Sequence, residues 1–281
     1  MLLTAGEATL HVLPEAGGSA AGWTWQGSPV MRPATADDLA AGQARRSGAY
    51  PLIPFSGRIA EGRFMWRGRE IALPHNFPPE TVAIHGDAWE QAWTIAEQGP
   101  SHVRLTLDHA AQPSWPFPYW AELGFTLLPD GLDVAIHLRA GEAMPAGLGW
   151  HPYFHRTAEA ALGFTAARVW IADEANIPAR EEAPSGPLRF DPLRPLGPAH
   201  VDNCYAGWSH RAELHLDHAR LELEADPVFD HLVVYTPAGR DFFCTEPATH
   251  APNAVNRPGG MRVLDKGETL AGTIRLRLFP R

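Results

Sequence analysis

The sequence predicts an all-β protein, a large antiparallel β-sandwich with few short helices. Polar and apolar residues alternate in several segments, which is the pattern of strands that bury one face. The 281 residues include 26 glycines and 27 prolines, so long helices cannot dominate the chain. Long helical segments do not alternate with the strands, which disfavours a doubly wound parallel sheet or a TIM barrel.

Five segments show the two-residue alternation most clearly. Pro129, Asp130 and Gly131 separate two alternating runs and predict a hairpin. A short helix is predicted within residues 35–46, because Thr35 can cap its amino terminus and two aspartates follow. The five expected strand segments are His102–His109, Leu132–Ala140, Glu213–Ala225, His231–Pro237 and Thr273–Pro280.

We expect residues 1–281 to form a single domain. The length suits one large sandwich as well as two ordinary domains. The proline-rich stretch Glu181–His200 could be a linker, but more strand-like segments follow it without a change in composition. We therefore interpret it as a long surface loop within one domain.

Charge and cysteine content restrict the class of protein. The formal net charge is −9, which disfavours a nucleic-acid partner, since such proteins need a basic face. The only cysteines are Cys204 and Cys244, too few for a disulfide framework or a four-cysteine zinc site, and this points to the cytoplasm. Neither a signal peptide nor a run of apolar residues long enough to span a membrane is evident, so we expect no membrane partner.

Common cofactor and nucleophile motifs are missing from the sequence. It contains no GxGxxG, GxxxxGK[ST], HExxH, GxSxG or CxxC. His151 and His155 lie four residues apart, but Pro152 and the aromatic neighbours favour extended chain, which would separate them by about 13 Å. Two side chains so far apart cannot share one ion. We expect neither a metal nor a cofactor.

Four side chains are candidates for chemistry. His85 and His151 each lie among glycines and aromatic residues, and glycine allows the backbone to approach a ligand closely. Taken alone, each histidine fits a structural role better than a catalytic one. Arg58, in a turn-like SGR context, can fork onto hydroxyls or a carboxylate. Glu246 follows an apolar aromatic run and is a candidate general base.

Together these segments resemble the aldose 1-epimerase (galactose mutarotase) family. PFSGRI resembles the family's asparagine–arginine–isoleucine signature, AIHGDAW its HG motif, LGWHPYF its GxHPYF motif and CTEPATH its late glutamate. VDNCYAGW places Asp202 where the family has a sugar-binding aspartate. The match runs from Pro51 to Asn256, and GWHPYF is its most specific part. The sequence departs from the family at Gly57, which replaces the asparagine, and after His85, where many members have an arginine.

The resemblance implies a galactose mutarotase-like supersandwich that interconverts the α and β anomers of a free aldose. Ring opening removes the proton from the C1 hydroxyl and protonates the ring oxygen. By resemblance, Glu246 is the base, His151 is the acid, and His85 donates a further hydrogen bond near the ring oxygen. A carboxylate and an imidazole suit these roles near neutral pH. This chemistry needs neither a metal nor a nicotinamide.

The expected partner is a small monosaccharide. Arg58 and Asp202 would hold its hydroxyls by resemblance, and an aromatic side chain such as Trp150 or Phe154 could pack on its apolar face.

Three other functions remain open from the sequence. A carbohydrate-binding module would keep the site without turnover. A glycoside hydrolase would use two carboxylates, for instance Glu246 with Asp202 or Asp230. An epimerase of hexose 6-phosphates would call for additional arginine or lysine near the far end of the sugar.

Overall fold

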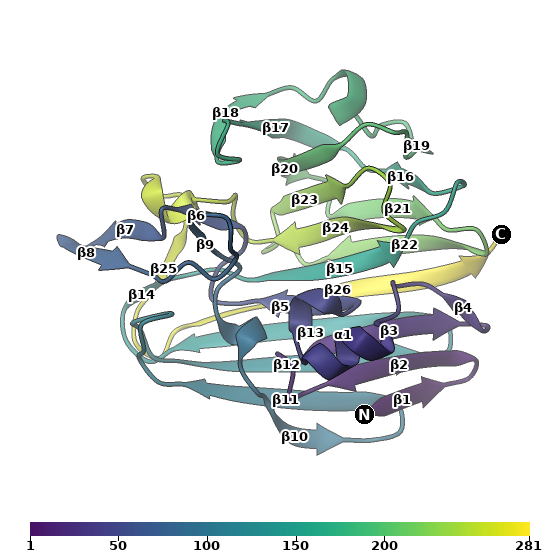
Figure 1. Ribbon diagram of the computed structural model, residues 1–281, viewed down its shortest axis with the longest axis horizontal. Coiled ribbons are helices and arrows are strands. Elements are labelled where there is room, and N and C mark those ends of the chain that lie inside the picture. The colour runs from purple at the N-terminus through teal and green to yellow at the C-terminus, as the bar shows by residue number, and fades with distance from the viewer.

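Two large antiparallel sheets contain most of the strands (Figure 1), which confirms the predicted all-β sandwich. The structure is a computed structural model that describes residues 1–281. The first sheet runs in the order β1 (Leu2–Ala5), β2 (Ala8–Leu13), β3 (Ser19–Trp25), β5 (Ala49–Leu52), β15 (Gly149–His155), β24 (Phe242–Ala248), β23 (His231–Thr236), β20 (Val201–Trp208), β17 (Ala166–Ala172) and β18 (Pro178–Glu182), with β4 (Ser28–Pro29) paired to β3.

The second sheet has nine strands. Their order is β10 (Thr94–Gln98), β11 (His102–His109), β12 (Tyr119–Leu128), β13 (Gly131–Ala140), β26 (Thr269–Pro280), β22 (Ala219–Ala225), β21 (Arg211–His215), β16 (Ala161–Gly163) and β19 (Arg194–Pro195). Three two-stranded sheets lie at one end of the sandwich, at the left of Figure 1. They pair β6 (Arg58–Ala60) with β9 (Val82–Ile84), β7 (Arg63–Trp66) with β8 (Arg69–Ala72), and β14 (Met144–Ala146) with β25 (Arg262–Leu264).

One core of 63 buried side chains joins the two large sheets. It contains Leu10 and Trp23 of the first sheet and Leu123 and Ile136 of the second, all at most 1% exposed. Every second side chain along these strands enters this core, as the burial pattern of β12 shows. The opposite face of each sheet is therefore turned away from this core. On the first sheet, that outer face bears the residues described in the next subsection.

The helices are few and short, as predicted. The helix α1 (Ala36–Ala41) is capped by Thr35, whose side chain accepts from the Asp38 backbone while the Asp38 carboxylate accepts from Thr35. It ends at Gly42, in the left-handed conformation, sooner than the sequence pattern indicated. The short 3₁₀ turns are η1 (Ala44–Arg46), η2 (Ala88–Glu90), η3 (Gly186–Leu188) and η4 (Ala254–Asn256).

The strand predictions hold with one correction. Pro129 and Asp130 form the predicted hairpin turn, since Leu128 pairs with Gly131. The segment Glu213–Ala225, expected as one alternating run, is instead the paired strands β21 and β22, because the chain reverses at 216–218. That turn contains neither glycine nor proline, and Asp217 is its one typical turn residue, so the signal in the sequence was weak.

The proline-rich stretch and the two cysteines can now be located in the fold. The stretch Glu181–His200 includes the end of β18, the turn η3 and the short strand β19, so it is partly ordered into both sheets. Both cysteines are buried and free. No helix is long and apolar enough to cross a membrane.

Candidate active site

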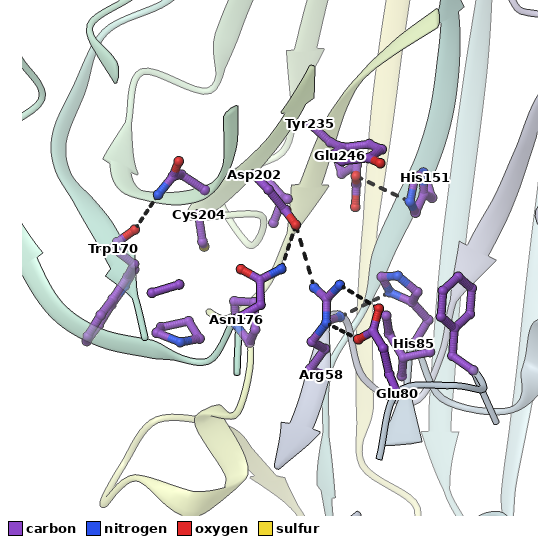
Figure 2. Close-up of a pocket in the computed structure, with 18 of the residues that line it drawn as sticks. Arg58, Glu80, His85, His151, Trp170, Asn176, Asp202, Cys204, Tyr235 and Glu246 are labelled. Carbon is purple, nitrogen blue, oxygen red and sulfur yellow. Dashed lines mark hydrogen bonds and ion pairs between the residues drawn. The ribbon is translucent and has the colours of Figure 1, made fainter. Parts of the chain in front are cut away.

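Two neighbouring strands bring His151 and Glu246 together. The register of β15 with β24 pairs Gly149 with Ala248 and Tyr153 with Cys244, so His151 and Glu246 lie opposite each other between these pairs. Directly opposite residues of an antiparallel pair project from the same face. Nε2 of His151 is 3.3 Å from Oε1 of Glu246, and both residues are buried (Figure 2).

Strand alternation separates the site from the core. On β24, Phe243 enters the core while Glu246 lines a cavity, and on β15 Phe154 enters the core while His151 and Tyr153 line the cavity. The cavity therefore lies on the face of the first sheet that is turned away from the second sheet. Tyr50 and Tyr153 stack on the imidazole of His151 at centroid distances of 4.8 and 4.5 Å and fix its plane.

Arg58 and Asp202 reach the same cavity from different elements. Arg58 is the first residue of β6, and Asp202 lies on β20, where it pairs across the strands with Tyr235 of β23. Nη1 of Arg58 is 3.8 Å from Oδ2 of Asp202. The amide of Asn176 donates to the same carboxylate oxygen at 2.6 Å. The structure thus brings together two side chains that are 144 positions apart in the sequence.

His85 is held at the end of β9 in an unusual conformation. Its φ is +65°, and the φ of the following Gly86 is +71°. A Cβ on Gly86 would lie 1.9 Å from the carbonyl oxygen of Ile53, so only glycine fits there. Nδ1 of His85 accepts from the Gly57 backbone N–H at 3.1 Å. The neutral ring therefore carries its proton on Nε2, where it can donate to a ligand.

A second histidine, His250, binds the backbone next to Gly57, in the turn that precedes Arg58. Nε2 of His250 accepts from the Ser56 backbone N–H at 3.2 Å, while its Nδ1 donates to the Ala251 carbonyl at 2.8 Å. Burial lowers the pKa of His250 to about 4, so its ring stays neutral and able to accept. Two neutral imidazoles thus fix the turn that presents Arg58.

Burial favours the uncharged forms of the central groups. Desolvation, followed by repulsion from Asp202, raises the pKa of Glu246 well above its ordinary value, and the Arg58 charge opposes this. Desolvation lowers the pKa of His151 to about 3 and the pKa of His85 well below its usual range. Burial therefore weakens the preference of the His151–Glu246 pair for the ionised state, a carboxylate beside an imidazolium, and brings the proton affinities of the two groups closer together.

The cavity has a volume of about 190 Å³. This is below the range of roughly 300–1,000 Å³ that pockets for drug-sized ligands occupy, so it suits a ligand of the size of one monosaccharide. Besides the residues described above, its lining includes Phe77, Glu80, Trp170, Asn203 and Cys204.

Trp150 and Phe154 do not reach the cavity, and the expectation that either could pack on a sugar is wrong. Both are 0% exposed and belong to the core between the sheets. They are even-numbered neighbours of His151 on one strand, so alternation turns them to the opposite face. The aromatic residues that line the cavity are Tyr50, Phe77, Tyr153, Trp170 and Tyr235.

Asp230, considered above as a second carboxylate, also lies outside the cavity. Its carboxylate contacts His231 at 2.5 Å and is 58% exposed. Of the two carboxylates considered as partners of Glu246, only Asp202 shares its cavity.

His151, Cys244 and Glu246 form a group that could hold a metal ion. Their ligand atoms lie within 4.8 Å of one another, and all three residues are buried. Nitrogen, sulfur and oxygen ligands of this kind suit zinc. Burial raises the pKa of the Cys244 thiol well above its ordinary value, however, and only the thiolate is a good ligand. An ion bound here would also engage both members of the His151–Glu246 pair.

The departure at Gly57 has a structural reason. Its φ is +73°, and a Cβ there would lie 2.7 Å from the ring of Pro252, which lines the cavity. We expect Gly57→Asn to destabilise the protein by about 1–3 kcal/mol through overpacking, measured by denaturant unfolding. Gly68→Asn is the control, because Gly68 has a φ of +82° and no atom within 4 Å of the added Cβ. Equal losses in both variants would mean that backbone conformation, rather than Pro252, disfavours the asparagine.

The fold and the site together define an all-β sandwich with a buried histidine–glutamate pair in a small cavity. The sequence profile described as aldose 1-epimerase matches residues 1–277. The chain therefore belongs to the aldose 1-epimerase family, as the sequence motifs predicted. Family membership supports an isomerase that acts on carbohydrates.

Individual relatives agree with this assignment. The uncharacterised Escherichia coli protein YphB is 28% identical over 93% of both chains, and mouse galactose mutarotase is 27% identical over 64% of this chain and 58% of its own. The crystal structure of a proposed aldose 1-epimerase from Escherichia coli covers 100% of this chain and 98% of its own, with 27% identity and a TM-score of 0.90. A Caenorhabditis elegans GalM/aldose epimerase homologue shares the fold at 14% identity, with coverages of 100% and 98% and a TM-score of 0.87.

Proposed function

We propose that the protein is a mutarotase, which interconverts the α and β anomers of a free aldose. The contact of 3.3 Å between His151 and Glu246 in a cavity of monosaccharide size is the observation that carries this proposal. The reaction needs one group that accepts a proton and one that donates a proton within reach of one sugar. Family membership supports the same chemistry.

Glu246 acts as the base toward the C1 hydroxyl. Its raised pKa matches the operating pH better than that of an ordinary carboxylate, so its ionised form is a stronger base. Arg58, whose charge opposes the rise, favours the ionised form that accepts the proton.

The two histidines act at the ring oxygen of the sugar, one as the acid and one as a hydrogen-bond donor. His151 protonates the ring oxygen as the C1–O5 bond breaks, and the open aldehyde forms. Nε2–H of His85 donates a hydrogen bond in the same region, because its Nδ1 is committed to Gly57. After rotation about C1–C2, the sugar closes on its other face with the acid and base roles reversed. Both residues then return to their starting protonation states.

The direct test is polarimetry of freshly dissolved α-galactose, α-glucose and arabinose, beside a calorimetric binding measurement. Acceleration of mutarotation of at least one sugar above the buffer rate is expected. Binding without acceleration would instead establish a carbohydrate-binding protein and overturn the proposal. Release of reducing sugar from aryl glycosides would identify a hydrolase that uses Glu246 with Asp202.

In a plot of kcat/KM against pH, the acidic limb, where activity falls at low pH, should report the ionisation of Glu246. Since burial raises this pKa, the limb should lie well above the ordinary carboxyl range. The Asp202 charge contributes to the rise, so Asp202→Asn should move the limb to lower pH while it weakens binding. Asp230→Asn, an exposed carboxylate outside the cavity, should leave the limb in place. A limb that stays or moves upward in Asp202→Asn would remove Glu246 as the titrating group.

A further inference from the structure

Arg58 is the only lysine or arginine among the residues that line the cavity. Arg45 and Arg257 lie nearby, but their guanidinium groups stack on the rings of Phe77 and Trp170 at 5.3 and 4.2 Å and do not line it. An anionic substituent on a bound sugar would therefore have Arg58 as its one cationic partner in the lining.

The bidentate edge of Arg58 is already occupied. Nε of Arg58 donates to Oε2 of Glu80 at 2.8 Å, and Nη2 donates to Oε1 of Glu80 at 3.3 Å (Figure 2). The two parallel bonds are the arrangement in which arginine binds a phosphate or carboxylate. The remaining nitrogen, Nη1, faces Asp202 at 3.8 Å. Glu80 thus takes the place that the anionic group of a ligand would need.

Glu80 is anchored and not a freely moving surface side chain. It follows Phe77 in the segment between β8 and β9, and its backbone N–H donates to the Phe77 carbonyl at 3.0 Å. Asn76 ties this segment to the end of β9, donating to the Ile84 carbonyl at 3.0 Å and accepting from the Ile84 N–H at 2.9 Å. The Glu80 side chain is 35% exposed, so it lies at the edge of the cavity.

The cavity as a whole is acidic. Glu80, Asp202 and Glu246 line it together with the single cation Arg58. An anionic sugar would have to displace Glu80 from Arg58 and would then face the freed carboxylate in a partly desolvated site, where like charges repel more strongly than in water. A neutral sugar meets neither cost.

We propose that Glu80 is a positioning and specificity-determining residue that restricts the cavity to sugars without an anionic substituent. It orients Arg58 so that Nη1 faces the bound sugar, and it denies the bidentate edge to phosphate and carboxylate groups. The inference rests on the proposed function, and it disfavours the hexose 6-phosphate alternative.

The test compares galactose and glucose with their 6-phosphates and uronic acids, with the enzyme-free rate subtracted for each sugar. Wild-type protein should show kcat/KM for the anionic sugars at least about tenfold below that for the neutral ones. Glu80→Gln should reduce this gap, the ratio of kcat/KM for neutral sugars to kcat/KM for anionic ones, by about tenfold or more, because it frees Arg58 for the anion. The same variant should raise KM for neutral sugars several-fold with little change in kcat, since Arg58 is less firmly held.

Glu70→Gln is the matched control. It removes the same charge from an exposed pair with Arg63 on the β7–β8 hairpin, outside the cavity, and should leave the gap intact. Equal kcat/KM for neutral and anionic sugars in wild-type protein, or a gap that Glu80→Gln leaves unchanged, would overturn the inference while mutarotation stands. If no sugar is turned over, calorimetric Kd values for the same sugars and variants still decide the inference by the same ratios.

Discussion

Replacing Glu246 by glutamine should abolish mutarotation while making the protein more stable. Glutamine keeps the size of the side chain and its hydrogen-bonding capacity but cannot take the C1 hydroxyl proton. We expect kcat to fall by about a thousandfold or more, at the level of positioned proton transfer. Polarimetry of the sugar that the wild-type protein turns over fastest measures this. Near-wild-type rates would remove Glu246 from the mechanism.

The stability change separates lost chemistry from lost structure. The folded-state pKa of Glu246 is raised, so the unfolded chain loses this proton at lower pH than the folded protein. Wild-type stability therefore falls as pH rises from the unfolded carboxyl pKa through the raised folded value. Glutamine does not ionise, so Glu246→Gln should gain stability relative to wild type across that window, measured by urea unfolding. Glu224→Gln, half of an exposed pair with Arg211, should change neither rate nor stability appreciably.

The sequence predicted the sandwich and most of its strands because strand alternation is a local signal. His102–His109 is the strand β11 as expected, and Leu132–Ala140 differs from β13 by one residue. The prediction of one strand over Glu213–Ala225 failed because the reversal contains no glycine or proline and breaks the polar–apolar alternation only at Asp217 and His218. The order of strands within each sheet is a long-range property, and no pattern in the sequence specified it.

The central site residues were found through motifs, and their neighbours were not. The structure brings Arg58, His85, His151, Asp202 and Glu246 to one cavity, from segments that no local rule connects. The prediction that Trp150 contacts the sugar was wrong, and strand alternation could have prevented it. If His151 faces the cavity, the residues next to it on the strand face the opposite way. The same rule would have selected Tyr153, two residues from His151.

Glu80 and His250 act through partners that are distant in sequence. Glu80 is 22 positions from Arg58, and His250 is 194 positions from Ser56. Glu80 lies in an irregular segment without periodicity, and His250 contacts a backbone N–H and a backbone carbonyl, which nearly any residue type supplies. Neither contact can be predicted from composition or from the spacing of residues.

Replacing His151 by asparagine should lower kcat about as much as the glutamate variant does, with only a modest change in KM. Protonation of the ring oxygen matters mainly in the transition state, so its loss should weaken ground-state binding little. Asparagine is too short to place a donor where Nε2 of His151 lies, 3.3 Å from Glu246. Initial rates by polarimetry over a range of sugar concentrations separate the two constants.

His155→Asn is the matched control, because His155 ends the same strand and does not line the cavity. It should retain wild-type kcat and KM. The stacked rings of Tyr50 and Tyr153 would remain in the His151 variant, so the cavity wall should persist and calorimetric sugar affinity should change little. A large loss of affinity with unchanged kcat would make His151 a binding residue and transfer the acid role to His85, the other histidine in the cavity lining, whose Nε2 carries the proton.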